Sequence, residues 1–221
     1  MDKTILLKFQ TIRKCVICKS YLTLEKELES DSVIWYGTTE KNRAIYHKDC
    51  LKKKMFTKRG NKLSEVEVGE LVDGLCGVGS DSLNHLDRLV YKNHLYLYLM
   101  QKYDIITIPN YIFTKMEQIF TGKFKTMSKP IPPEHLLDMF QRKASFLDGI
   151  YHKEKLDGVS RINYDLAVLV NKYPSYLDWL GKRESEGKKI VEYTIQNEGI
   201  GLTTMIPKNE TIKRDEDIFE E

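Results

Sequence analysis

Two pairs of metal-ligating residue types, 28 residues apart, place the strongest constraint on how this chain can fold. The first pair is Cys15 and Cys18, and the second is His47 and Cys50, each with two residues between its members. Closely spaced pairs can converge on one tetrahedral ion, and Zn²⁺ prefers a mixture of thiolate and imidazole ligands. The pattern therefore predicts one zinc ion, and a closed set of four protein ligands indicates a structural rather than a catalytic role.

The residues around the two pairs predict the local structure that would bring them together. The first pair would lie in a tight turn. Residues 33–36 and 44–46 are rich in β-branched and aromatic residues, and they predict two short strands around a polar turn. A helix is expected from His47 to Gly60, and residues three apart on a helix share a face. The positive end of this helix would favour the thiolate of Cys50.

Other interpretations of the cysteines remain open at this point. The Cys15–Cys18 pair alone is compatible with a redox dithiol, although the strand-to-helix setting typical of that motif is not evident here. The cysteines can also be unliganded. Four potential ligands in two close pairs are nevertheless a much more specific pattern than a lone cysteine pair, which favours the metal site. Cys76 is interpreted as a small buried residue.

The spacing of the four ligands and the "YH-x2-C-L" context of His47 resemble the zinc finger of poly(ADP-ribose) polymerases, which also occurs on one class of DNA ligases. The resemblance covers residues 10–60. It implies a treble-clef-like fold in which Cys15, Cys18, His47 and Cys50 hold zinc, and a role in recognising DNA breaks. The first half of a LIM domain is similar too, but its second cysteine pair is absent. Nothing downstream resembles an ADP-ribosylating or a ligase domain.

The charge of the chain is unevenly distributed. Residues 1–62 contain fifteen Lys and Arg against seven Asp and Glu, a net charge of +8, whereas the remainder carries a net charge of −5. A basic module is attracted to phosphate, which predicts DNA as a partner. The candidate contacts are Lys48, Lys52, Lys53, Lys54, Lys58 and Arg59. The competing interpretation is that these lysines only form a solvated helix face, and that the chain binds a protein partner through another surface.

Aromatic residues in the same module have two interpretations as well. Trp35, Tyr36 and Tyr46 lie in or beside the predicted strands. Aromatic rings of this kind can stack on bases. In small zinc fingers they more often form the core that packs beside the metal.

Helical signals dominate the chain after residue 62. Ser64 and Glu67 have the spacing of a capping box, which predicts a helix start. Apolar residues at helical spacing predict further helices. The expected helices cover residues 64–75, 81–104, 110–122 and 133–158, and then segments on either side of Pro174.

The last part of the chain has a different character. Residues 188–196 alternate as a strand does, and residues 199–207 could return as its partner, which predicts a terminal β-hairpin. Residues 208–221 are polar and acidic, and they are expected to form a flexible tail. Within this tail, Ile218 and Phe219 lie between acidic residues and could form a short docking motif.

The sequence thus predicts an α+β protein: a small treble-clef-like zinc finger joined to a mostly α-helical domain with a C-terminal hairpin. The expected domains are residues 1–62 for the finger, 63–207 for the helical domain and 208–221 for the acidic tail. No apolar run approaches the ~18 residues needed to span a bilayer, so no membrane association is expected. The apolar stretch at the N-terminus is too short for a signal peptide. Few cysteines remain outside the metal pattern, which favours an intracellular protein, cytoplasmic or in the nucleoid or nucleus.

The most direct functional hypothesis is a zinc-binding, non-enzymatic DNA-binding protein. The chain lacks a nucleophile elbow, a Walker lysine loop, a dinucleotide-binding glycine pattern and a zinc-protease helix. One alternative is a protein–protein adaptor or inhibitor in which the zinc finger is a scaffold. A second alternative is an HNH-like nuclease, which would need a further catalytic histidine on the hairpin or helix.

Overall fold

A computed structural model describes residues 10–58, 60–77, 79–124, 127, 129–154 and 158–198. Over these residues the fold is α+β, mostly helical with two small two-stranded sheets. Contacts divide the chain into two compact units. The first comprises the chain up to Phe113 together with Pro132–Leu137, and the second comprises Thr114–Ile131 and the chain from Asp138 onward. Each unit is described separately below.

The first unit begins with a hairpin that encloses the first cysteine pair. Strands β1 (Ile12–Lys14) and β2 (Tyr21–Thr23) pair antiparallel, with Lys14 opposite Tyr21. The turn between them closes through two backbone hydrogen bonds, from Cys15 N–H to Ser20 O and from Lys19 N–H to Cys15 O. Lys19 adopts a left-handed conformation with φ of 63°. The sequence predicted the turn but not the two strands.

The second hairpin matches its prediction closely. Helix α2 (Leu24–Glu29) leads into strand β3 (Val33–Tyr36), which pairs antiparallel with β4 (Ala44–His47). A short 3₁₀ helix, η1 (Glu40–Asn42), forms the connection. Gly37 is required here, because a Cβ atom would lie 2.6 Å from the backbone of Arg43. The predicted strands at residues 33–36 and 44–46 are thus confirmed.

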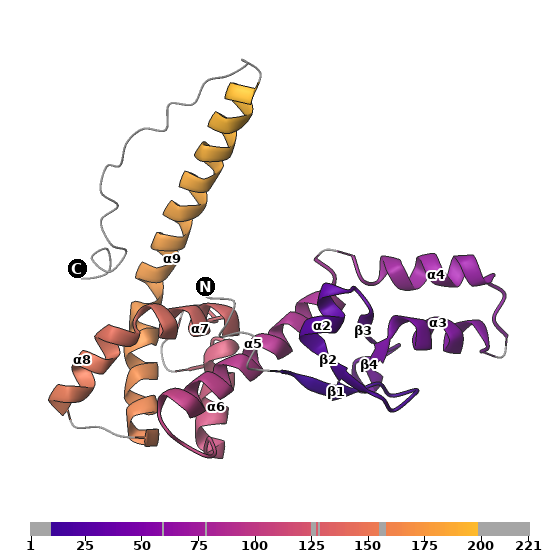
Figure 1. Ribbon diagram of the computed structural model, residues 1–221. Coiled ribbons are helices and arrows are strands. Elements are labelled where there is room, and N and C mark those ends of the chain that lie inside the picture. Colours follow the sequence, from indigo (N-terminus) through magenta and orange to yellow (C-terminus); the bar gives the residue numbers. More distant parts are fainter. Residues whose placement is uncertain are drawn as a thin grey trace. The chain divides into compact units, whose positions relative to one another are not determined.

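Two helices follow the second hairpin and lie side by side (Figure 1). Helix α3 (Lys48–Phe56) starts directly after β4, and α4 (Glu65–Gly74) returns along it. The predicted capping box is confirmed: the Ser64 hydroxyl accepts from Glu67 N–H, and the Glu67 carboxylate accepts from Ser64 N–H at 2.7 Å.

Helix α5 (Asp81–Lys102) completes the core of the first unit. Its cap, Ser80, accepts a hydrogen bond from Leu83 N–H. Buried side chains from both hairpins and from α2, α3, α4 and α5 form one apolar cluster: Cys15, Leu22, Leu24, Val33, Ile34, Tyr46, Leu51, Val72, Leu86 and Val90. The core beneath the cysteine pairs therefore includes residues from helices that lie beyond residue 62.

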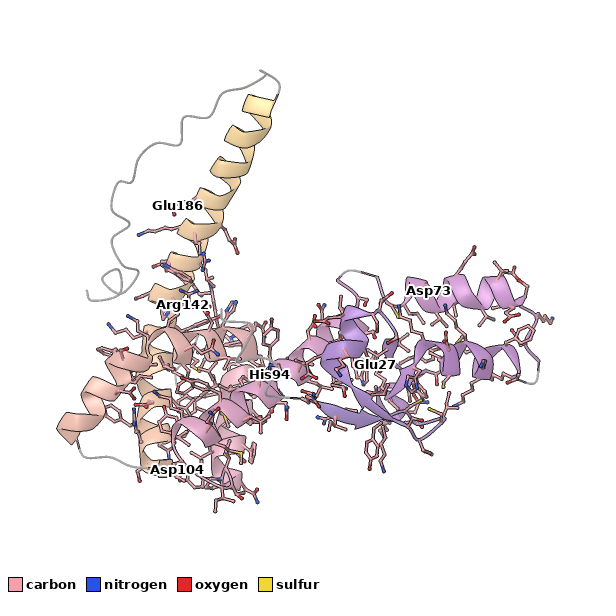
Figure 2. The ribbon with its side chains drawn as sticks, viewed as in Figure 1. Glu27, Asp73, His94, Asp104, Arg142 and Glu186 are labelled. Atoms are coloured by element: carbon pink, nitrogen blue, oxygen red, sulfur yellow. The ribbon has the colours of Figure 1, made fainter. Side chains whose placement is uncertain are left out.

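Helices form the described part of the second unit. They are α6 (Asn110–Phe120) from Thr114 onward, α7 (Pro133–Arg142) from Asp138 onward, α8 (Ala144–Glu154) and α9 (Gly158–Glu198). Asp138 ties α7 to α9, since it accepts from Arg142 Nε at 2.7 Å and from the Tyr176 hydroxyl at 2.9 Å. The Arg142 guanidinium, labelled in Figure 2, also lies 4.2 Å from the centre of the Trp179 ring.

Two predictions about the later part of the chain are wrong. Residues 188–196 are helical within α9, not a strand, and Pro174 lies inside that helix instead of separating two helices. A helix that is already nucleated extends at little cost, and Lys, Arg and Glu around residues 182–189 favour it. Buried Tyr173 and Tyr176 flank the proline and hold both sides of it in the helical core. The predicted partner strand at residues 199–207 and the tail at 208–221 lie outside the described residues.

Substitution of Leu86, a residue of α5, tests whether the hydrophobic core of the first unit extends beyond residues 1–62, the predicted finger. Its side chain is 1% exposed, so Leu86→Ala should lower the free energy of unfolding by about 2–5 kcal/mol. Leu71→Ala is the matched control, because Leu71 is 45% exposed and should cost less than about 1 kcal/mol. Urea unfolding followed by tryptophan fluorescence measures both. If Leu86→Ala lowered the free energy of unfolding as little as Leu71→Ala does, α5 would not be part of this core.

Candidate metal centre

Four side chains from distant parts of the first unit converge on one point. The ligand atoms of Cys15, Cys18, His47 and Cys50 all lie within 4.8 Å of one another. His47 Nδ1 is 3.4 Å from Cys18 Sγ and 3.7 Å from Cys50 Sγ. These four residues can therefore hold a metal ion. Within the described part of the chain, no other group of three or more His, Cys, Asp or Glu side chains has this arrangement.

The secondary structure explains why the two pairs meet. Cys15 directly follows β1, and Cys18 lies in the turn before β2. His47 is the last residue of β4 and caps α3, while Cys50 lies in the first turn of that helix. A backbone hydrogen bond of 3.1 Å from Val16 N–H to Ile45 O joins the two halves.

The thiols differ in how readily they ionise. Hydrogen bonds from Ser20 lower the pKa of the Cys18 thiol to about 6. Burial opposes ionisation of Cys15, but hydrogen bonds from the backbone of Cys18 and His47 lower its pKa overall. Burial, together with the neighbouring thiols of Cys18 and Cys15, raises the pKa of Cys50 to about 11. Three thiolates this close together repel one another, and a bound cation is the arrangement that removes this repulsion.

The imidazole shares this electrostatic environment. Burial lowers the pKa of His47, but hydrogen bonds to the sulfurs of Cys15 and Cys18 and their charges raise it overall. The Nδ1 atom of His47 therefore lies beside the cysteine sulfurs, which carry negative charge when they are ionised. That nitrogen is placed to be the metal-binding atom, which leaves Nε2 for a supporting hydrogen bond.

Among the predicted nucleic-acid contacts, the first two lysines of α3 are held by carboxylates. Lys48 is only 5% exposed, and its ammonium pairs with Asp31. Lys52 Nζ lies 3.0 Å from a carboxylate oxygen of Asp73 on α4, which Figure 2 labels. Lys48 thus supports the fold from inside, and Lys52 links α3 to α4.

The remaining predicted contacts are distributed differently. Lys53, Lys54 and Lys58 are exposed, and Lys54 lies 5.7 Å from the centre of the Tyr46 ring. Within the described part of the chain, none of these three lysines forms an ion pair with a carboxylate. Arg59 lies outside the described residues.

The three aromatic candidates do not form a common surface. Trp35 stacks on His85 of α5 with ring centres 3.7 Å apart, and the Arg43 guanidinium lies 4.6 Å from the centre of its ring. Tyr46 is buried in the core, and Tyr36 lines a groove described below. Trp35 therefore serves the packing of the hairpin on α5.

Sequence reasoning missed an exposed face on the β1–β2 hairpin. Arg13, Lys14 and Lys19 are all exposed, and Tyr21 is 70% exposed with the Lys14 ammonium 4.7 Å from the centre of its ring. The side chain of Ile12, at the start of β1, is exposed as well. The basic residues on either side of Cys15 were visible in the sequence, but strands of three residues give too short a pattern to predict the hairpin that carries them.

Glu25 supports the hairpin in a way that the sequence did not indicate. Its carboxylate accepts two hydrogen bonds from Thr11 N–H, at 2.9 and 3.0 Å. It also lies 2.8 Å from Nε2 of His94, a buried residue of α5 labelled in Figure 2. The contact fixes the start of β1 against α5. Because 69 residues separate Glu25 from His94, no local pattern could have predicted it.

Comparisons with models of protein families, with curated proteins and with solved structures find no match to this chain. Its candidate site therefore has to be interpreted from its own geometry. Over the described residues, no helix has both the length and the apolar composition that crossing a membrane requires.

Proposed function

We propose that Cys15, Cys18, His47 and Cys50 bind one structural Zn²⁺ ion, and that the first unit is a DNA-binding module. The observation that carries the zinc assignment is the convergence of three thiols and one imidazole within 4.8 Å. The observation that carries the DNA assignment is the set of exposed lysines Lys53 and Lys54 on α3, the helix that supplies Cys50, and Lys58 just after the end of that helix.

The separations of the ligand atoms support zinc. Zn–S bonds of about 2.3 Å and Zn–N bonds of about 2.0–2.1 Å place sulfur and nitrogen about 3.6 Å apart across a tetrahedral ion. The two sulfur-to-nitrogen distances at His47 are 3.4 and 3.7 Å. Four protein ligands complete the tetrahedral coordination of the ion and leave no open position for substrate. The ion would therefore stabilise the fold and not catalyse a reaction.

The order of elements supports a treble-clef-like arrangement. A hairpin with a cysteine turn comes first, a second hairpin follows, and a helix then carries the last ligand. This order is consistent with the resemblance to poly(ADP-ribose) polymerase-type fingers. The features shared with that family are the spacing of the four residues and the sequence around His47.

Two exposed basic surfaces support DNA as the ligand. The first consists of Lys53 and Lys54 on α3 and Lys58 just after it, and the second consists of the exposed basic residues of the β1–β2 hairpin, with Tyr21. Neutralisation of phosphates by such side chains releases counterions, which makes binding salt-dependent. Contacts to the backbone carry no sequence information, so discrimination between sequences should be weak. Lys48 and Lys52 are left out of this surface, because their ammonium groups pair with carboxylates.

An adaptor function is the second candidate, and exposed apolar residues favour it. Phe56, Leu63 and Val66 are 46%, 41% and 70% exposed around the connection between α3 and α4. Exposed large apolar side chains, when they lie together, are typical of protein-binding surfaces. An apolar protein interface would depend only weakly on salt, whereas phosphate binding would weaken steeply as salt rises.

The metal assignment predicts one zinc ion per chain in the purified protein. Cys15→Ser/Cys18→Ser removes two ligands and should abolish stoichiometric zinc, because the remaining pair cannot complete the tetrahedron. Elemental analysis by mass spectrometry measures the zinc content. Cys76→Ser is the control, since Cys76 lies outside the cluster and its variant should keep one ion. Full zinc occupancy in the double variant would contradict the assignment.

The DNA assignment predicts that binding depends on the exposed lysines of α3 and of the turn that follows it. Lys53→Ala/Lys54→Ala/Lys58→Ala should weaken binding and lower the slope of log K against log salt by up to about three units, since each lost phosphate contact lowers it by about one. A titration of labelled duplex DNA at several salt concentrations measures both quantities.

The control for this titration carries the same change in charge at a different place. Lys123, Lys129 and Lys182 are exposed residues of the second unit, and their triple alanine variant should bind as the wild type does. No binding by the wild type at low salt, or equal losses in the two variants, would contradict the DNA assignment and favour the adaptor.

A further inference from the structure

A groove of about 730 Å³ opens between the second hairpin and helices α3 and α4, all within the first unit. Its apolar floor includes Leu51, Met55 and Val68, and the aromatic rings of Tyr36 and Tyr46 lie along it. The volume falls within the ~300–1,000 Å³ that is usual for sites that bury a compact ligand. None of the four candidate metal ligands lines this groove, and the proposed function by itself gives it no occupant.

The ring of Tyr36 is available to a ligand. Tyr36 ends β3, and the residue directly opposite it on β4 is Ala44, whose methyl group can cover only a small part of the ring. Over the described residues, no ring contact, ion pair or side-chain hydrogen bond involves Tyr36. Trp35, on the opposite face of the same strand, already stacks on His85. Because aromatic rings pack well on one another, the groove side of this hairpin is suited to hold a planar ring.

The polar side chains of the groove add positive charge. The side-chain carboxamides of Asn42 and Asn61 are both engaged by backbone N–H groups of their own loops. Lys54 on α3 and Lys58 just after the end of that helix are exposed and line the groove, and among the described lining residues there is no carboxylate. The groove therefore fits a ligand that joins a planar ring to negative charge.

We propose that this groove binds one unpaired base of DNA, an inference that rests on the proposed DNA-binding function and extends it. The base stacks on Tyr36, and the phosphates on either side of it pair with Lys54 and Lys58. A paired base inside a duplex is not a ligand for this site, because its neighbours cover both of its faces and leaving the stack costs least for a base without a partner. Every base has an aromatic face, so discrimination among the four bases should be weak.

The place of the two lysines favours an unpaired base over an apolar peptide. Lys54 and Lys58 belong to the proposed DNA surface together with Lys53, so a DNA backbone bound there lies at the edge of the groove. An apolar peptide would fill the floor but leave both ammonium groups without a partner. Single-stranded nucleic acid offers both features, because it is held by cations along its backbone and by aromatic rings under its bases.

Three DNA probes and the full-length, zinc-loaded protein test this proposal. The first probe is a fluorescein-labelled, fully paired duplex. The second carries one extra, unpaired thymine in the middle of one strand, and the third carries an abasic residue in place of that thymine, so these two have the same phosphates and differ in the base. In fluorescence anisotropy at one fixed salt concentration, the wild type should bind the thymine probe about fivefold to tenfold more tightly than the abasic probe.

Removal of one aromatic ring gives the second readout. Tyr36→Leu keeps an apolar side chain but removes the ring, so the preference for the thymine probe should fall below about twofold. A zinc content of one ion per chain verifies that this variant is folded. Tyr111→Leu is the matched control, because Tyr111 of α6 is 55% exposed and does not line the groove. It should keep the preference of the wild type.

Three results would overturn the unpaired-base site: equal affinity of the wild type for the thymine and abasic probes, an unchanged preference in Tyr36→Leu, or the same loss of preference in Tyr36→Leu and Tyr111→Leu. Equal affinity for all three probes would leave the groove to an apolar peptide, as the adaptor candidate requires. Failure of the proposed function gives a different result, because the wild type would then bind none of the three probes.

Discussion

Four side chains from two separate pairs must come within a few ångströms of one another, and the first unit depends on that convergence. The turn after β1 presents two sulfurs, and the junction between β4 and α3 presents an imidazole and a third sulfur. Close packing of three thiols is unfavourable for a protein on its own, since ionised sulfurs repel and buried ones lose hydration. A bound cation converts this repulsion into attraction, so metal binding and folding of this unit should be coupled.

The rest of the unit supports this convergence through contacts that span the sequence. Val16 joins the cysteine turn to β4, and Glu25 fixes the first hairpin against His94 of α5. Lys48 is buried beside Asp31, next to the ligand His47 in the chain. Lys48, the first residue of α3, thus serves the fold, whereas Lys53 and Lys54 of the same helix are exposed. One helix therefore carries both a lysine that supports the fold and lysines that face solvent, and only the exposed ones belong to the proposed DNA surface.

Local signals in the sequence were sufficient for much of this picture. The spacing of the two pairs predicted which four residues converge. The β-branched and aromatic residues predicted β3 and β4, and the Ser64–Glu67 capping box predicted the start of α4. Strands β1 and β2 were missed because three residues give too short a pattern. The burial of Lys48 and the contact from Glu25 to His94 depend on partners distant in the chain, which no local pattern encodes. The strand predicted at residues 188–196 failed because continuation of α9 outweighed a short alternation.

X-ray absorption spectroscopy at the zinc edge tests the central claim most directly, because it reports the ligands of the metal itself. If Cys15, Cys18, His47 and Cys50 hold the ion, the spectrum should show four-coordinate zinc, with three sulfur atoms at about 2.3 Å and one nitrogen atom at about 2.0–2.1 Å. In His47→Cys the nitrogen should be replaced by a fourth sulfur. Oxygen ligands, a coordination number of five or six, or an unchanged spectrum in His47→Cys would contradict the account.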